Sequence, residues 1–242
     1  MKTILIVGIG TGNPEHLTVQ AINALNRADV LFIPDKGAGK ADLADLRREI
    51  VARYVTNPNS RTVEYTMPKR DAANPDYGAG VDDWHAALAA RFGALLENVP
   101  GNGACAFLVW GDPGLYDSTI RIVERLRSEH EVEIVPGITS IQALTAAHRI
   151  ALNRIGEPVH ITTGRQLGPV VDDTVVMLDG QTAFLNADPD LDIFWGAYLG
   201  TPDEITIAGR LGAVREQIVA TRKAARERHG WIMDTYLLRK RE

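Results

Sequence analysis

Residues 110–118, Trp-Gly-Asp-Pro-Gly-Leu-Tyr-Asp-Ser, form the stretch of this chain whose composition best suits ligand chemistry. Its two glycines let the backbone approach a ligand closely or take a positive φ, and Pro113 stiffens the turn. The carboxylate of Asp112 adds a hydrogen-bond acceptor for whatever binds there. A tight turn in which Ser118 caps the next helix explains the same residues equally well.

The flanks of this segment indicate where it lies in the fold. An apolar run at residues 104–109 precedes it and is typical of a buried strand. Ile120, Val123 and Leu126 follow it at helical spacing. The segment is therefore predicted to be a loop at the carboxyl end of a strand, where open α/β sheets bind their ligands.

A second candidate binding segment is the glycine-rich turn Gly8-Ile9-Gly10-Thr11-Gly12, which follows the first apolar run. Its spacing resembles a dinucleotide fingerprint, and Asp35 ends the second predicted strand, where a ribose-binding acid would lie. However, the fingerprint needs a third glycine three residues after the second, and Asn13 occupies that position. Glu15 would also repel a pyrophosphate at the start of the following helix. A nucleotide-dependent oxidoreductase is therefore disfavoured.

A third segment, Val-Pro-Gly-Ile-Thr-Ser at residues 135–140, ends a strand at a Pro-Gly pair and begins a helix with hydroxyl side chains. Thr139 or Ser140 would cap this helix. Because this segment and residues 110–118 both follow the carboxyl ends of parallel strands, we expect them to form two adjacent walls of one binding site.

The pattern of the first half predicts a parallel sheet. Apolar runs alternate with helix-length spacers, and such crossovers are right-handed. We therefore expect an N-terminal α/β domain at residues 1–136. Its predicted strands are 4–7, 30–33, 61–66, 104–109 and 132–135, and its predicted helices are 17–28, 42–54, 81–99 and 118–128.

The second half is expected to form a C-terminal α/β domain at residues 137–242. Several of its connections are too short to hold a crossover helix, which predicts a mixed sheet. Its predicted strands are 159–162, 174–178, 195–199, 205–208 and 231–238, with helices at 140–147 and from residue 211 onward.

Composition excludes several classes of partner. The net charge is −5 and there is no long basic run, which disfavours nucleic acid as the main partner. Cys105 is the only cysteine, so we expect a buried, inert thiol and no export. The apolar N-terminal run is too short for a signal peptide or a membrane span, and the six histidines lack metal-site spacing. A cytoplasmic protein without a metal or membrane partner is expected.

Four motifs occur in order along the chain: Val7-Gly8-Ile9-Gly10-Thr11-Gly12 with Leu17-Thr18, Gly111-Asp112-Pro113, Pro136-Gly137-Ile138-Thr139-Ser140, and Thr201-Pro202-Asp203-Glu204 before Gly209. This order resembles the tetrapyrrole methylases of corrin biosynthesis, which use S-adenosylmethionine. The stretches at 10–18, 109–118, 152–158, 195–200 and 229–236 resemble the deacetylating members in particular. Most of the family has proline where this chain has Thr11, and that departure agrees with the deacetylating members.

The resemblance implies two α/β domains, the first mainly parallel and the second mixed, with the methyl donor in a cleft between them. It also implies a homodimer. The family's donor contacts map onto Thr11, Trp110, Gly111, Asp112, Leu115, Thr139, Ser140, Asp179, Ala208 and Gly209.

The implied reaction methylates precorrin-5 at C-1 and releases its acetyl unit as acetate. An electron-rich ring carbon is the nucleophile, so no protein nucleophile is required. Acetyl release needs a delivered water, for which Asp35, Tyr116 and Asp117 are the candidate acid–base groups. The substrate carries many carboxylates, and basic side chains should bind them. The candidates for that role are Lys36, Arg165 and Arg210.

Two alternatives stay open within this resemblance. One is a tetrapyrrole methylase that acts on another position or another substrate. The other, from a different class, is a catalytically inactive protein that binds S-adenosylmethionine.

Overall fold

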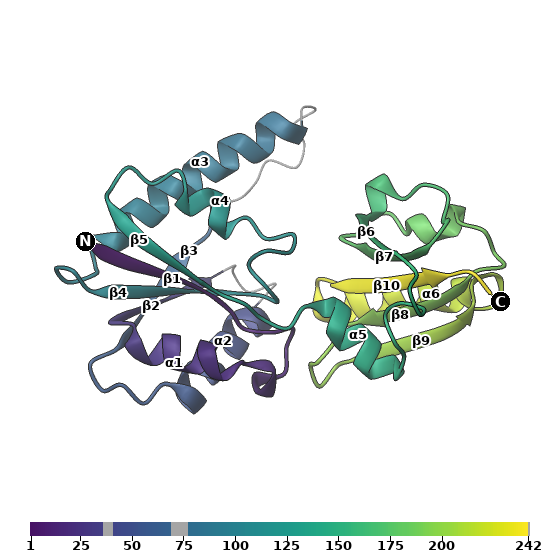
Figure 1. Cartoon of the computed structure of the whole chain (residues 1–242), viewed down its shortest axis with the longest axis horizontal. Helices are drawn as coiled ribbons and strands as arrows, with labels where there is room; N and C mark the ends of the chain where they lie inside the picture. Colours follow the sequence, from purple (N-terminus) through teal and green to yellow (C-terminus); the bar gives the residue numbers. More distant parts are fainter. Residues whose placement is uncertain (36–40, 69–76, 242) are drawn as a thin grey trace. The chain divides into compact units, whose positions relative to one another are not determined.

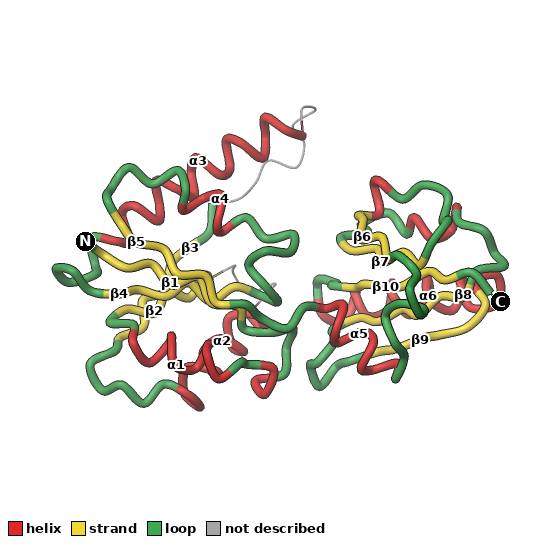
Figure 2. Tube along the Cα trace, in the orientation of Figure 1, coloured by secondary structure: helices red, strands yellow, loops and turns green. Residues whose placement is uncertain are grey.

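The computed structural model describes residues 1–35, 41–68 and 77–241, and its internal contacts divide the chain into two compact units (Figures 1 and 2). The first unit is Met1–Gly10 with Pro14–Ile138, and the second is Thr11–Asn13 with Thr139–Glu242. The domain boundary expected after Pro136 stays a prediction. No helix in the described ranges is long and apolar enough to cross a membrane.

The first unit alternates strands with helices, as its apolar runs predict. Thr18 caps the first long helix through a hydrogen bond from Ala21 N to its hydroxyl (3.0 Å). The elements are β1 (Lys2–Gly8), η1 (Pro14–His16), α1 (Val19–Arg27), β2 (Val30–Asp35), α2 (Ala41–Tyr54), β3 (Arg61–Thr66), α3 (Tyr77–Leu96), β4 (Ala104–Val109), α4 (Thr119–Val123) and β5 (His130–Val135).

These strands form one sheet in the order β3-β2-β4-β1-β5, and every pairing in it is parallel. The predicted parallel sheet is confirmed. Helices α1 and α2 cover one face of this sheet, and α3 and α4 cover the other (Figure 1). The carboxyl ends of β4, β1 and β5 therefore lie next to one another at one edge.

Both faces of this sheet are buried at its central strands β1, β2 and β4, which are apolar at successive positions. Ile4 and Ile6 belong to the core under α3 and α4, whereas Leu5 and Val7 belong to the core under α1 and α2. Cys105 lies in the first of these cores, and burial raises the pKa of its thiol to about 12. The expectation of a buried thiol is confirmed, and the thiol stays protonated at neutral pH.

The second unit contains the predicted mixed sheet, in the order β6-β7-β10-β8-β9. Only β6 and β7 pair in parallel, and the other neighbours are antiparallel. Trp195, Tyr236 and Phe184 are fully buried here. The elements are α5 (Ser140–His148), β6 (Val159–Thr163), η3 (Gly164–Gln166), β7 (Asp173–Met177), η4 (Ala183–Asn186), β8 (Asp192–Ala197), β9 (Ile205–Arg210), α6 (Leu211–His229) and β10 (Asp234–Arg239).

Most predicted elements begin or end at other residues in the structure, and three of these differences concern a helix and two strands near the predicted motifs. The helix expected at 118–128 ends at Val123, because the next turn tightens into i→i+3 hydrogen bonds such as Leu126 N to Val123 O (3.0 Å). The strand expected at 195–199 is β8, which begins at Asp192 and ends before Tyr198, whose φ of 51° turns the chain away. The strand expected from residue 231 begins at Asp234.

Candidate active site

The segments that follow β1, β4 and β5 contact one another through their backbones. Gly10 and Gly111 form an isolated antiparallel bridge, with Gly111 N donating to Gly10 O at 2.8 Å. A Cβ on Gly137 would lie 2.1 Å from Gly111 O, and a Cβ on Gly8 would lie 2.6 Å from Gly137 N. Only glycine permits these approaches. The two predicted walls, 110–118 and 135–140, do adjoin.

Asp112 holds these two walls together. Its Oδ1 accepts a hydrogen bond from Gly114 N (2.7 Å), within its own loop. Its Oδ2 accepts one from Gly137 N (2.8 Å), in the loop after β5. The Asp112 carbonyl also accepts from Leu115 N (3.3 Å). Asp112 therefore shapes the binding edge itself, and its predicted contact with a ligand stays a prediction.

The structural role of Asp112 has a measurable consequence. In Asp112→Asn the side chain keeps one carbonyl oxygen, so one of the two backbone N–H groups loses its acceptor. We expect the free energy of unfolding to fall by about 1–3 kcal/mol, measured by urea denaturation. Asp45→Asn is the control, because Asp45 is exposed and pairs with Arg48 at the surface. Equal stability of the two variants would assign Asp112 to ligand contact alone.

The same sheet opens beside this edge. Strand β2 pairs with β4 only from Val30 to Phe32, although it continues beside β3 to Asp35. Met67 N donates to Asp35 O (3.3 Å), so the backbone of Asp35 faces β3 and that of the preceding residue, Pro34, faces β4. Proline has no N–H to donate, and the β2–β4 ladder ends before it.

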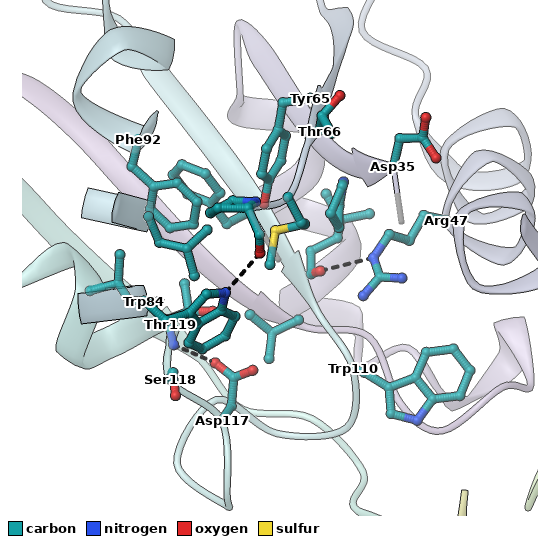
Figure 3. A pocket seen from close by; sticks show the side chains of 18 of the residues that line it. Asp35, Arg47, Tyr65, Thr66, Trp84, Phe92, Trp110, Asp117, Ser118 and Thr119 are labelled. Carbon is teal, nitrogen blue, oxygen red and sulfur yellow. Dashed lines mark hydrogen bonds between the residues drawn. The ribbon is translucent and has the colours of Figure 1, made fainter. Parts of the chain in front are cut away.

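A cavity of about 580 Å³ lies where β2 and β4 separate (Figure 3). All three predicted acid–base residues, Asp35, Tyr116 and Asp117, line it, and so does Trp110. Sequence positions more than 80 residues apart are thus brought to one pocket. The apolar and aromatic part of the wall comes from Tyr65, Met67, Trp84, Leu88, Phe92, Phe107 and Ile122.

The loop at the mouth of the cavity is held by local bonds. Asp117 Oδ1 accepts a hydrogen bond from Thr119 N (2.6 Å), which fixes the start of α4 (Figure 3). The φ of 51° at Tyr116 is a strained backbone conformation for a residue other than glycine. Its side chain is exposed at the mouth of the cavity. Trp84 Nε1 donates to Pro68 O (2.9 Å) across the aromatic wall.

Arg47 also lines the cavity, and sequence reasoning missed it. The residue is only 4% exposed, and its Nε donates to Leu108 O (3.1 Å) while Nη1 donates to Leu43 O (2.7 Å). Burial lowers the pKa of the guanidinium to about 10, so it remains a cation at neutral pH. A signal was available: Leu43, Arg47 and Ile50 share one face of α2, an apolar face that should not carry an arginine.

Thr139 and Ser140 were the two predicted caps of α5, and in the structure the cap is Thr139. Its hydroxyl accepts from Ile141 N (3.1 Å), and the Gln142 side chain accepts from Thr139 N (3.1 Å). Ser140 Oγ lies 3.4 Å from Thr235 Oγ1. Thr11 is 3% exposed, and its hydroxyl has no hydrogen-bond partner within the described residues.

The carboxylate of Asp179 stabilises the fold of the second unit. It is 4% exposed, and its carboxylate accepts hydrogen bonds from Gln181 N (3.0 Å), Ala183 N (2.7 Å) and the Tyr236 hydroxyl (2.7 Å). Ala208 and Gly209 lie in β9, opposite Phe194 and Ile193 of β8.

Two of the three predicted substrate-binding cations, Arg165 and Arg210, belong to the second unit. Lys36 lies outside the described residues. Arg165 is exposed on η3. Arg210 pairs with Asp190 at the surface, and this carboxylate raises its pKa. Contacts of these three residues with a substrate stay predictions.

Two known proteins match this chain over nearly its whole length. A precorrin-6A synthase [deacetylating] from Sinorhizobium sp. is 59% identical over 250 residues, covering 99% of this chain and 96% of the relative. A solved structure described as a cobalamin synthesis related protein (CobF) from Corynebacterium diphtheriae has 42% identity and a TM-score of 0.87, with 100% of both chains covered.

A more distant structure shares the fold. It is a uroporphyrin-III C-methyl transferase from Thermus thermophilus complexed with S-adenyl homocysteine, 20% identical with a TM-score of 0.62, covering 98% of this chain and 92% of that one. The family model for Tetrapyrrole (Corrin/Porphyrin) Methylases matches residues 3–215. The chain therefore belongs to the tetrapyrrole (corrin/porphyrin) methylases.

Proposed function

We propose that this protein is an S-adenosylmethionine-dependent C-methyltransferase of cobalamin biosynthesis, which methylates precorrin-5 at C-1 with loss of acetate to give precorrin-6A. The observation that carries this is the 59% identity, over 99% of the chain, to a precorrin-6A synthase [deacetylating]. Such identity over the full length favours the same reaction over methylation at another ring position.

The methyl donor supplies an electrophilic methyl group, and the chain supplies position and a dry surface. In the first unit we assign Trp110, Gly111, Asp112 and Leu115 to it. In the second unit we assign Thr11, Thr139, Ser140, Asp179, Ala208 and Gly209. The residues present fit such a ligand, because the Thr11 hydroxyl has no partner in the described part of the chain. Asp179 would act by shaping the turn at 179–183, since its oxygens already accept three hydrogen bonds.

Acetate release is assigned to the cavity between β2 and β4. Asp35, Tyr116 and Asp117 line that cavity and would hold a water or move its proton. Asp117 is the leading proton acceptor: Oδ1 is bonded to Thr119 N, whereas Oδ2 has no hydrogen bond among the described residues. Lys36, Arg165 and Arg210 remain proposed contacts for substrate carboxylates. We also propose, on the family resemblance, that the protein works as a cytoplasmic homodimer.

The decisive experiment is incubation of the purified protein with precorrin-5 and methyl-labelled S-adenosylmethionine. We expect one labelled methyl group in the product and one acetate released per turnover. Calorimetry should also show micromolar binding of S-adenosylhomocysteine and none of NADH.

The other outcomes separate the alternatives. A labelled product that keeps its acetyl group would indicate a methylase for another position. Donor binding without turnover of any precorrin would indicate an inactive binding protein. Binding of NADH tighter than S-adenosylhomocysteine would overturn the proposal.

A further inference from the structure

Arg47 occupies the place in the sheet that a strand neighbour would fill. The β2–β4 ladder stops before Pro34, and Arg47 Nε reaches from α2 to bond the carbonyl of Leu108 in β4 instead. Figure 3 shows this bond and the guanidinium beside the cavity. The side chain is therefore fixed at a defined position in the cavity wall.

The bonds that fix Arg47 leave part of its guanidinium available. A guanidinium has five N–H donors. One hydrogen bond from Nε and one from Nη1 go to carbonyl oxygens, and Nη2 donates to none of the described residues. Neither carbonyl carries a formal charge, so these bonds position the cation without neutralising it.

The surroundings make an unmatched cation costly. Within the described ranges Arg47 forms no ion pair. Tyr65 and Asp117 act on its guanidinium by charge without a hydrogen bond to it, and the Asp35 carboxylate lines the same cavity (Figure 3). Phe107 and Leu108 add apolar wall on the side of β4. Burial of a charge without a partner is unfavourable, and its presence at a cavity points to an anionic ligand.

We propose that the Arg47 guanidinium binds a carboxylate of the tetrapyrrole substrate in the cavity between β2 and β4. This inference rests on the proposed function, which supplies a polycarboxylated macrocycle. A cavity of about 580 Å³ suits a peripheral side chain and part of the ring edge rather than the whole macrocycle. The planar fork of arginine matches a carboxylate, and burial strengthens the bond. Tyr65, whose pKa burial raises, stays protonated and adds a second donor.

The test compares Arg47→Met with Arg48→Met. Arg48 is the next residue of α2, but it is exposed and pairs with Glu64 and Asp45. We expect Arg47→Met to raise KM for precorrin-5 by roughly 10- to 100-fold, with kcat changed less than threefold, because a charge-assisted bond is lost from binding. Arg48→Met should keep the parent values.

A pair of stable probes identifies the group that Arg47 recognises. One is a metal-free corrin with free carboxylate side chains, and the other is the same corrin with those side chains converted to amides. In the Arg47→Met protein, affinity for the acid should fall by roughly 10- to 100-fold, and affinity for the amide by less than threefold. A purely structural role would weaken both equally.

Two results would overturn the inference: parent KM and parent acid affinity in Arg47→Met, or a loss of kcat without a change in KM. If Arg47→Met does not fold, Arg47→Lys is the deciding variant, because lysine keeps the charge and lacks the planar fork of the guanidinium. An unchanged ratio of acid affinity to amide affinity in Arg47→Lys would also contradict the inference.

Binding of S-adenosylhomocysteine by each variant separates the two proposals. If the wild-type protein binds it but does not turn over precorrin-5, the proposed function fails, and the corrin pair still tests Arg47.

Discussion

Asp117→Asn is expected to slow acetate release by roughly 10²–10⁴-fold while methyl transfer continues near the parent rate. The two steps ask different things of the protein: displacement at sulfur needs alignment, whereas acetyl release needs a proton acceptor or a held water. Asparagine keeps the oxygen that accepts from Thr119 N, so the loop before α4 should keep its shape. Mass spectrometry of quenched reactions should show a methylated, still acetylated intermediate.

Asp35→Asn and Tyr116→Phe test the other two residues at this cavity in the same assay. Asp82→Asn is the control, because Asp82 is exposed and pairs with Arg125. Parent rates of acetate release in all three cavity variants would show that none of these residues assists the step. Equal losses of methyl transfer and acetate release would instead indicate a shared effect on substrate binding.

The parallel sheet of the first unit was predictable because its burial follows a local pattern. Leu5 and Val7 face one core while Ile4 and Ile6 face the other, so the whole run must be apolar. Element ends were less predictable. Strand β8 stops at Tyr198 because of a positive φ, and only the fold around that residue decides such a conformation.

The binding edge was predictable in outline for a related reason. Segments that follow parallel strands meet at the carboxyl edge, and the contact of Asp112 with Gly137 confirms that two of them adjoin. From the sequence alone, however, Asp112 was predicted to contact a ligand, and its hydrogen bonds to two backbone N–H groups were not predicted. Its two backbone partners depend on β4 and β5 both flanking β1, and strand order is set by long-range packing.

The cavity was not predictable from local patterns. Pro34 ends a ladder only because β2 lies beside β4, a neighbour more than 70 residues away in the chain. Because β2 and β4 stop pairing there, the carbonyl of Leu108 in β4 accepts its hydrogen bond from Arg47 instead. The sequence shows an arginine on an apolar face of α2. What this arginine binds depends on where β2 and β4 stop pairing, which the sequence does not show.

Gly137→Ala is expected to destabilise the protein by about 3 kcal/mol or more, because it overpacks a site made of backbone. The added Cβ would lie 2.1 Å from Gly111 O and 2.8 Å from Gly8 Cα. No side chain can rotate to relieve these contacts, so the loop after β5 must move. That movement also lengthens the bond from Gly137 N to Asp112. Urea denaturation measures the loss.

Gly93→Ala is the matched control in the same unit. Gly93 lies within α3, where an added Cβ would meet nothing within 4 Å. Alanine should therefore stabilise that helix by about 0.5–1 kcal/mol. The double variant Gly137→Ala with Asp112→Asn should lose less than the sum of the two single losses, because both changes break the same contact between loops. Strict additivity, or a Gly137→Ala protein as stable as the parent, would contradict the apposition of these loops and with it the positioning role of Asp112.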